Sequence, residues 1–381
     1  MKQAIILLLS CITLIAILIV GKLHWDGKIE AAGNGAVAGE ENDQSSSNAE
    51  QERTSPSTDN NQELEVTAAE DAWLLSHGNW EQVEIPDWGP VMQGTFKSTG
   101  EPAFGRKASI STNSSFATLI QRNMEGSVSI YVDGELVKTR ELRNDGTKSE
   151  IEIFTGSEGW HEIELVYSGF AEVTSLIIDA GAEVQKPEAA SEKVVVIGHN
   201  YGHINPSSKH FVSLLGSELD MEVVNQGIAG TDLNISNPED QENSGLNRVE
   251  DDVIAEDPTA ILVVYGQHAL PGLTEETITY TDYYMDLIEF LIKIRNELPD
   301  VPVFISGAIA TPVADDNALN RLNTNLNYAR AEVSGTAFID LAGLWNSNNF
   351  NTYVNGEALT EQGHVFLAEK YAEAISEYLD N

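Results

Sequence analysis

The sequence predicts an α/β domain with a doubly wound parallel sheet, preceded by an all-β sandwich or jelly-roll domain and by an N-terminal membrane helix. Three observations lead to this prediction. An uncharged apolar run opens the chain, short alternating runs fill its middle, and apolar runs alternate with helix-length segments from Lys193 onward. Strands buried on both faces form continuous apolar runs, whereas strands with one exposed face alternate with a period of two. The middle and the C-terminal half therefore belong to different fold classes.

Residues 1–28 have the features of a membrane anchor or a signal. The run at residues 4–20 contains no charged residue, and Lys2 precedes it. Its length is at the short end for a membrane-spanning helix, and no small-residue cleavage site follows it directly. We therefore expect an uncleaved single-pass anchor in the cell membrane, with the bulk of the chain extracytoplasmic. Secretion after signal cleavage is the alternative.

Residues 29–66 predict a disordered linker. They include few large apolar side chains and many Ser, Asn, Gln and Glu residues. Such a segment cannot bury enough apolar surface to offset the entropy lost on ordering. We expect a flexible stalk that holds the folded body away from the membrane.

The charge of the chain limits its partners. With 60 acidic and 21 basic residues, the formal net charge is −39. Nucleic acids and anionic lipid headgroups bind basic faces, so neither is an expected partner. The single cysteine, Cys11, excludes an internal disulfide and a cysteine-based metal cluster.

Residues 67–186 predict the all-β domain. Two runs, at 150–154 and 160–167, alternate strictly between apolar and polar side chains, and the run at 126–132 meets an Asp133-Gly134 hairpin turn. Many short strands at regular spacing are typical of a sandwich or jelly roll. The other predicted strands are 109–111, 116–120, 135–138 and 173–178.

Residues 192–381 predict the α/β domain. The expected strands are 193–197, 221–225, 260–265, 302–305 and 337–341, and the expected helices are 207–219, 248–255, 274–298, 314–333 and 360–379. Asp251 and Asp252 are interpreted as solvated charges on the second of these helices. Ligands bind at the carboxyl ends of the strands in such sheets, so the loops after Ile197, Val224, Tyr265 and Leu341 are the candidate site.

Those loops carry the sequences VVVIG followed by His199-Asn200, then NQGIAG, then VVYG followed by Gln267-His268, and finally LTEQGH before the last helix. In this order they resemble the motifs of the SGNH (GDSL-type) hydrolases, over about half of the chain. The resemblance implies a flavodoxin-like sheet and an activity on esters, often acetyl groups on polysaccharides. A β-sandwich ahead of such a domain is similar to some two-domain carbohydrate esterases.

The resemblance also implies where the catalytic groups belong. In the family, a serine attacks the ester, a glycine and an asparagine donate to the oxyanion, and an Asp-x-x-His supplies the carboxylate and the base. Asn200 occupies the nucleophile position, Gly230 the oxyanion glycine and His268 the oxyanion asparagine. Asn355 and Ala358 occupy the positions of the aspartate and the histidine. The serine, the aspartate and the histidine are thus all substituted.

These substitutions predict a catalytically degenerate pseudoenzyme. Acyl transfer requires a nucleophile that a neighbouring base can deprotonate, and neither an asparagine amide nor an alanine can take those roles. We expect a protein without a cofactor that binds a cell-envelope polysaccharide or an ester-bearing glycan in its cleft, or that serves as a scaffold for partner enzymes. His199, His203 and Gln267 are the candidate ligand-binding residues.

Two alternatives remain open. One is an active esterase for O-acetyl or lipid esters, with relocated catalytic groups or with a histidine-based metal site. His199, His203 and His268 all lie in strand-end loops, and imidazoles can bind metal ions or act as acid and base. The other is a structural role, in which the β-sandwich binds the ligand and the α/β domain is a spacer.

Overall fold

The computed structural model describes residues 63–96, 98, 105–156, 159–199, 201, 209–228, 230–234, 243–310, 315–345, 349–356 and 358–380. The chain divides into a unit of residues 1–58 and a compact unit of residues 59–381, which contains all of the described residues. The expected anchor at 1–28 and most of the expected linker at 29–66 lie outside the described residues. Within the described ranges, no helix is long and apolar enough to cross a membrane.

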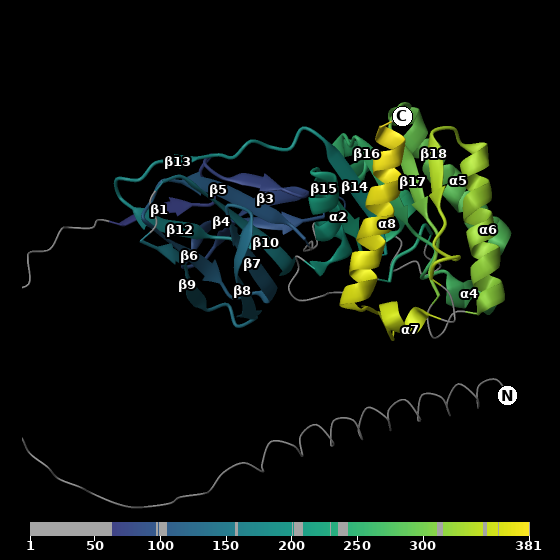
Figure 1. Cartoon of the computed structure of the whole chain (residues 1–381), viewed down its shortest axis with the longest axis horizontal. Helices are drawn as coiled ribbons and strands as arrows, with labels where there is room; N and C mark the ends of the chain where they lie inside the picture. Colours follow the sequence, from purple (N-terminus) through teal and green to yellow (C-terminus); the bar gives the residue numbers. More distant parts are fainter. Residues whose placement is uncertain are drawn as a thin grey trace, which may run out of the picture. The chain divides into compact units, whose positions relative to one another are not determined.

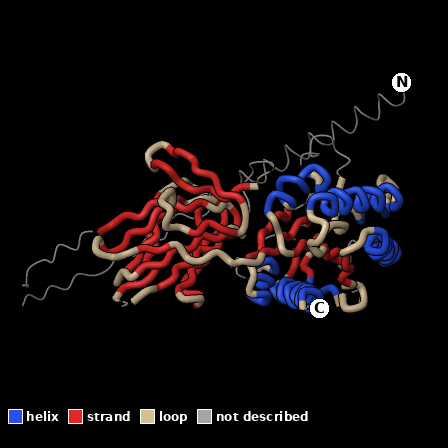
Figure 2. Tube along the Cα trace, turned by 90° about the horizontal axis from the view of Figure 1, so that it is seen from above, coloured by secondary structure: helices blue, strands red, loops and turns tan. Residues whose placement is uncertain are grey.

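The middle of the chain forms antiparallel sheets (Figures 1 and 2). One sheet has the order β1 (Glu63–Thr67), β12 (Ser175–Asp179), β6 (Phe116–Arg122) and β9 (Lys148–Thr155). A second has the order β13 (Val184–Gln185), β5 (Lys107–Thr112), β10 (His161–Gly169), β7 (Glu125–Val132) and β8 (Glu135–Arg143), and β2 (Leu74–Ser76) pairs with β5. A smaller sheet joins β11 (Glu172–Val173), β4 (Gly89–Thr95) and β3 (Asn79–Ile85).

Apolar side chains from the two larger sheets form a common core, as expected for a sandwich. Leu119 of β6 and Leu176 of β12 belong to the same buried cluster as Ile110 of β5 and Ile163 of β10. The expected β-rich domain is therefore confirmed. Its first strand, β1, begins at Glu63 and so includes residues that we assigned to the linker. The local sequence does not reveal this strand because its stability comes from antiparallel pairing with β12, more than a hundred positions away.

Residues from Lys193 onward form a five-stranded parallel sheet with the order β15, β14, β16, β17, β18. The strands are β14 (Lys193–Gly198), β15 (Glu222–Gly227), β16 (Ala260–Val264), β17 (Val303–Ser306) and β18 (Thr336–Ile339). The helices are α2 (Phe211–Leu219), α3 (Gly245–Asp252), α4 (Leu270–Thr274), α5 (Tyr280–Glu297), α6 (Asp316–Glu332), α7 (Phe350–Tyr353) and α8 (Glu361–Leu379), with a 3₁₀ turn at Ile254–Glu256. A two-stranded hairpin joins β19 (Val354–Asn355) to β20 (Ala358–Leu359).

All five predicted strands of this sheet are present, and the expected doubly wound architecture is confirmed. The strands are nearly continuous apolar runs because helices cover both faces of the sheet (Figure 2). The helix predicted at 274–298 begins later, at Tyr280 of α5, and Thr274 is instead the last residue of the short helix α4. Glu276 adopts a left-handed conformation with φ of 58°, and Thr279 caps α5 by accepting a hydrogen bond from the Asp282 backbone N–H at 3.0 Å.

A pair of buried arginines connects the β-rich region with the parallel sheet. The Arg106 guanidinium donates hydrogen bonds to the carbonyl oxygens of Thr95 and Asn225, each at 2.9 Å. Arg248 of α3 donates to the Gln226 carbonyl at 2.5 Å and to Asp252 at 2.8 Å. Asn225 and Gln226 lie near the end of β15, so these contacts hold the backbone that leads into the Gly230 loop.

Both arginines contact one aromatic ring, Phe96. The guanidinium carbons of Arg106 and Arg248 lie 5.5 Å and 5.2 Å from the Phe96 ring centroid, within the range of cation–π contacts. Asp252, interpreted from the sequence as a solvated charge, is instead fully buried, where it accepts hydrogen bonds from Arg248 and from the Ser98 hydroxyl. Burial lowers the pKa of Arg106 to about 10, so its side chain stays charged at neutral pH.

We expect Arg106→Met to lower the free energy of unfolding by about 3 kcal/mol, because the substitution leaves buried carbonyls and carboxylates without their cation. Urea-induced unfolding measures this change. Arg106→Lys should recover only part of the loss, since an ammonium lacks the planar fork that reaches several carbonyls. Arg140 is exposed on β8, and Arg140→Ala should change the stability by no more than about 0.5 kcal/mol. Equal unfolding midpoints for Arg106→Met and the unchanged protein would contradict the proposed role of the buried charge.

Candidate functional site at the strand ends

The loops at the carboxyl ends of β14, β15 and β16 bring three predicted site residues together. His199 follows β14, and its backbone N–H donates to the Val264 carbonyl of β16 at 2.9 Å. The Gly230 backbone N–H donates to His199 Nδ1 at 3.4 Å. The rings of His199 and His268 are nearly parallel, with their centroids 6.5 Å apart and an angle of 10° between the planes. His199, Gly230 and His268 are therefore neighbours at the strand ends.

A glycine at the end of β14 permits this close arrangement. Gly198 has a φ of 136°, and a Cβ atom there would lie 2.4 Å from the Val264 carbonyl oxygen. Any larger residue would push β14 away from β16. His199, the next residue, would then move away from Gly230.

The protonation state of His199 follows from its surroundings. Burial, together with the nearby charge of His268, lowers the pKa of His199 from 6.5 to about 4. The imidazole is therefore neutral at pH 7, and its role as an acceptor from Gly230 assigns the proton to Nε2. The backbone N–H that the resemblance assigns to the oxyanion is thus already engaged by a side chain of the same protein.

A buried carboxyl lies close to this group. Asp232 Oδ1 accepts hydrogen bonds from the Tyr283 hydroxyl at 2.8 Å and from the Leu233 backbone N–H at 2.7 Å. Its Oδ2 is buried and has no hydrogen-bond partner in the described part of the chain. Burial raises the pKa of Asp232, and the opposing influences include the charge of His268. The sequence analysis gave Asp232 no role. Its place two positions after Gly230 is the feature of the sequence that could have identified it as a residue of this site.

The remaining predicted positions have different surroundings. Gln267 Oε1 accepts a hydrogen bond from the Ile309 backbone N–H at 2.9 Å, so this side chain connects β16 with the segment after β17. Asn355 and Ala358 are exposed partners in the β19–β20 hairpin. The neighbouring Leu359 N–H donates to the Tyr201 carbonyl at 3.5 Å, and the Tyr201 ring lies edge-on to His199 at 4.9 Å. The hairpin therefore borders the loop that contains His199.

Two predicted residues, Asn200 and His203, lie outside the described residues. In the ranges that the structure describes, no group of three or more His, Cys, Asp or Glu side chains is placed to hold a metal ion. In the same ranges, no hydroxyl forms a hydrogen bond with His199 or His268. The described residues therefore contain no hydroxyl–imidazole pair at the strand ends.

Comparisons with known proteins give structural relatives only. No family model and no curated protein sequence matches this chain. The fold is similar to a salicylyl acyltransferase from a tetracycline biosynthetic pathway, with a TM-score of 0.67, 14% identity, and coverage of 83% of this chain and 97% of that chain. It is also similar to a family two carbohydrate esterase from Clostridium thermocellum in complex with cellohexaose, with a TM-score of 0.61, 14% identity, and coverage of 81% and 99%.

A third similar structure is a GDSL-like lipase from Bacteroides ovatus, with a TM-score of 0.59, 16% identity, and coverage of 84% of this chain and 98% of that chain. The similarity extends over both the β-rich region and the parallel sheet, since most of this chain is covered. The expected SGNH-like α/β fold is therefore confirmed. At these identities the likeness concerns the fold alone.

We expect the Gly230 amide to report the titration of His199. Its NMR signal should stay constant as the pH falls from 7 to about 5 and shift as the pH passes about 4, where protonated Nδ1 no longer accepts. Because the folded pKa lies below the ordinary histidine value of 6.5, the unfolded chain binds this proton first. His199 therefore destabilises the fold as the pH falls from 6.5 towards about 4, and has no such effect above that window. His199→Phe should abolish the shift, whereas a transition near pH 6.5 in the unsubstituted protein would contradict this geometry.

Proposed function

We propose that this chain is a membrane-anchored, extracytoplasmic SGNH-hydrolase-like protein that binds a cell-envelope carbohydrate without cleaving it. The observation that carries the inactivity is the hydrogen bond from the Gly230 N–H to His199. An oxyanion donor accelerates acyl transfer only if it is free to meet the negative charge that develops on the substrate. Here this donor already has an acceptor.

The expected acid–base groups support the same proposal. Asn355 and Ala358 stand where the resemblance puts an aspartate and a histidine, and neither side chain can relay a proton at neutral pH. Asp232 is a poor replacement for the missing carboxylate, because burial raises its pKa and so disfavours the charged form that would orient an imidazole. Reaction through a covalent acyl-enzyme therefore lacks the family's base and the carboxylate that orients it, since both positions carry other side chains.

Carbohydrate binding is supported by the site and by one structural relative. Gly230, His268 and Asn355 are exposed, and at least the first two lie at strand ends, where ligands of parallel α/β sheets bind. The similar esterase from Clostridium thermocellum was solved in complex with cellohexaose. A net charge of −39 favours neutral ligands over polyanions.

The proposed membrane attachment rests on the uncharged run at residues 4–20 and on Lys2 before it. An integral anchor keeps the protein in the membrane fraction during alkaline extraction, because burial of the apolar helix does not depend on charge. Recovery of a shortened chain in the soluble fraction would instead identify cleavage of a signal.

The purified protein should hydrolyse p-nitrophenyl acetate and acetylated xylan no faster than buffer containing a heat-denatured sample. Combined restoration of the family's side chains, Asn200→Ser, Asn355→Asp and Ala358→His, should raise the rate at least about tenfold when His199→Asp is added, since the family's serine follows a Gly-Asp pair. The His199 substitution also frees the Gly230 N–H.

The matched control for this restoration is the same variant with Asn200 unchanged, which lacks the nucleophile and should be inactive. Turnover by the unsubstituted protein that His268→Ala abolishes would contradict the proposal. It would support the alternative of relocated chemistry around the parallel rings of His199 and His268. Metal analysis of that protein, with and without His199→Ala, would then distinguish a metal site from acid–base catalysis.

Binding at the strand ends is tested with cellohexaose by isothermal titration calorimetry. His268→Ala and Asn355→Ala should each weaken binding about tenfold, because each removes an exposed hydrogen-bonding group from the candidate site. Arg140→Ala, on the β-rich region, is the control and should bind as the unsubstituted protein does. Unchanged affinity in both site variants would exclude these residues from the ligand contact.

A further inference from the structure

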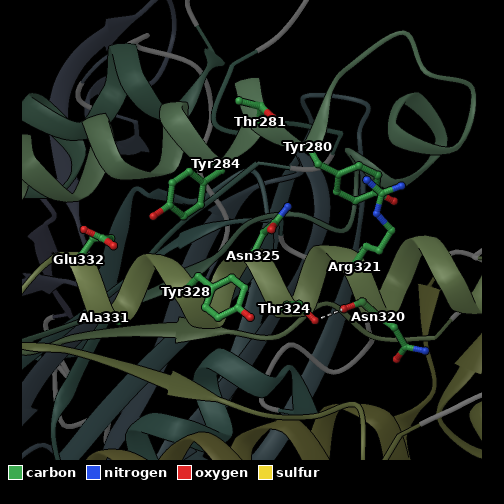
Figure 3. A pocket seen from close by; sticks show the side chains of 10 residues that line it. All are labelled: Tyr280, Thr281, Tyr284, Asn320, Arg321, Thr324, Asn325, Tyr328, Ala331 and Glu332. Carbon is green, nitrogen blue, oxygen red and sulfur yellow. Dashed lines mark hydrogen bonds between the residues drawn. The ribbon is translucent and has the colours of Figure 1, made fainter.

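A second candidate binding site lies on the surface formed by α5 and α6. These helices pack against each other and leave a groove of about 710 Å³ (Figure 3). This volume falls within the range usual for small-ligand sites. Tyr280, Thr281 and Tyr284 come from α5, and the other lining residues come from α6: Asn320, Arg321, Thr324, Asn325, Tyr328, Ala331 and Glu332. The groove shares no residue with the strand-end site.

Three tyrosines give the groove its aromatic surfaces. The Arg321 guanidinium lies over the Tyr280 ring, with Cζ 4.0 Å from the ring centroid, and the Tyr280 hydroxyl donates to the Ala318 carbonyl at 3.2 Å. Tyr284 extends from α5 and Tyr328 from α6, and Asn325 of α6 lies beside them (Figure 3). Tyr328 is 62% exposed, although an exposed helix position usually carries a charged or small polar residue.

The polar groups between these rings are available to a ligand. In the described part of the chain, the side chains of Asn325, Tyr284 and Tyr328 make no hydrogen bond. Arg321 and Glu332 add one cation and one carboxylate, so the groove has balanced charge. Its wall therefore combines flat apolar rings with neutral donors and acceptors.

We propose that this groove binds a neutral oligosaccharide. A sugar ring has an apolar C–H face that stacks on an aromatic ring, and a rim of hydroxyls that pair with amides, carboxylates and guanidinium groups. The net charge of −39 disfavours polyanionic ligands, which the protein repels. A protein partner is less suited, because the rings are separated by polar side chains instead of forming one continuous apolar patch.

The proposal goes beyond glycan binding at the strand ends and is independent of it. On α5, Tyr283 is buried and donates to Asp232, whereas Tyr280 and Tyr284 line the groove. Neighbouring residues of α5 thus face different places: Tyr283 faces the protein interior, and Tyr284 faces the groove. Substitutions at Tyr284 or Tyr328 leave the strand-end contacts of Tyr283 in place.

The test is calorimetric titration of the full chain in detergent with cellohexaose, xylohexaose and maltohexaose. At least one hexasaccharide should bind, with Tyr284→Ala and Tyr328→Ala each lowering its affinity about tenfold. Tyr328→Phe keeps the stacking surface and should retain most of the affinity. Tyr378→Ala is the matched control, because Tyr378 is 45% exposed on α8, outside the groove.

The outcomes separate this site from the strand-end site. Binding that survives His268→Ala but is weakened by Tyr328→Ala supports the groove, whatever happens at the strand ends. Binding that His268→Ala abolishes and the tyrosine variants leave unchanged overturns the groove and leaves the strand-end proposal intact. Absence of binding to all three sugars overturns the groove proposal. So does a dimer that Tyr328→Ala converts to a monomer in light scattering, since the groove would then contact a second copy.

Discussion

The position of the candidate site depends on two buried positive charges. Arg106 and Arg248 hold the carbonyl groups of Asn225 and Gln226, just before the turn that carries Gly230. Removing a guanidinium from water is costly unless its donors are paired, and here backbone carbonyls and Asp252 pair most of them; only Arg106 Nε and Arg248 Nη1 lack a partner among the described residues. Apolar packing alone cannot orient a carbonyl, whereas a charged hydrogen bond can. The β-rich region thus takes part in the geometry of the strand ends, since it contributes Arg106.

The strand-end geometry has a chemical consequence. In the implied family, the Gly230 position donates to an oxyanion; here it donates to a neutral imidazole. Burial keeps His199 neutral and so leaves a lone pair on Nδ1 to accept this bond. The same loop shape is therefore compatible with a site that binds a ligand and with one that performs chemistry. The difference lies in which group faces the glycine.

Several features were predictable from local sequence. The five strands of the parallel sheet are continuous apolar runs, and the capping residue Thr360 precedes the last helix. The assignment of Asn355 and Ala358 to the aspartate and histidine positions stays a prediction that rests on the LTEQGH anchor. Other features were not predictable. From the sequence, Asp252 is interpreted as a surface charge, whereas in the structure Arg248 and Ser98 donate hydrogen bonds to it. Gln267 is interpreted as a ligand-binding residue, whereas in the structure it accepts a hydrogen bond from the Ile309 backbone.

The sequence by itself determined the order of the five parallel strands and the type of the longer helices, because hydrophobic period and capping depend on neighbouring residues. It also predicted, through the resemblance to the SGNH hydrolases, that the serine, aspartate and histidine positions carry other side chains. Only the tertiary structure decided that His199 accepts from Gly230, that Asp232 is buried near His268, and that three tyrosines of α5 and α6 line one groove. These residues are distant in sequence, and their contacts, charges and pKa values exist only once the sheet and its covering helices have assembled.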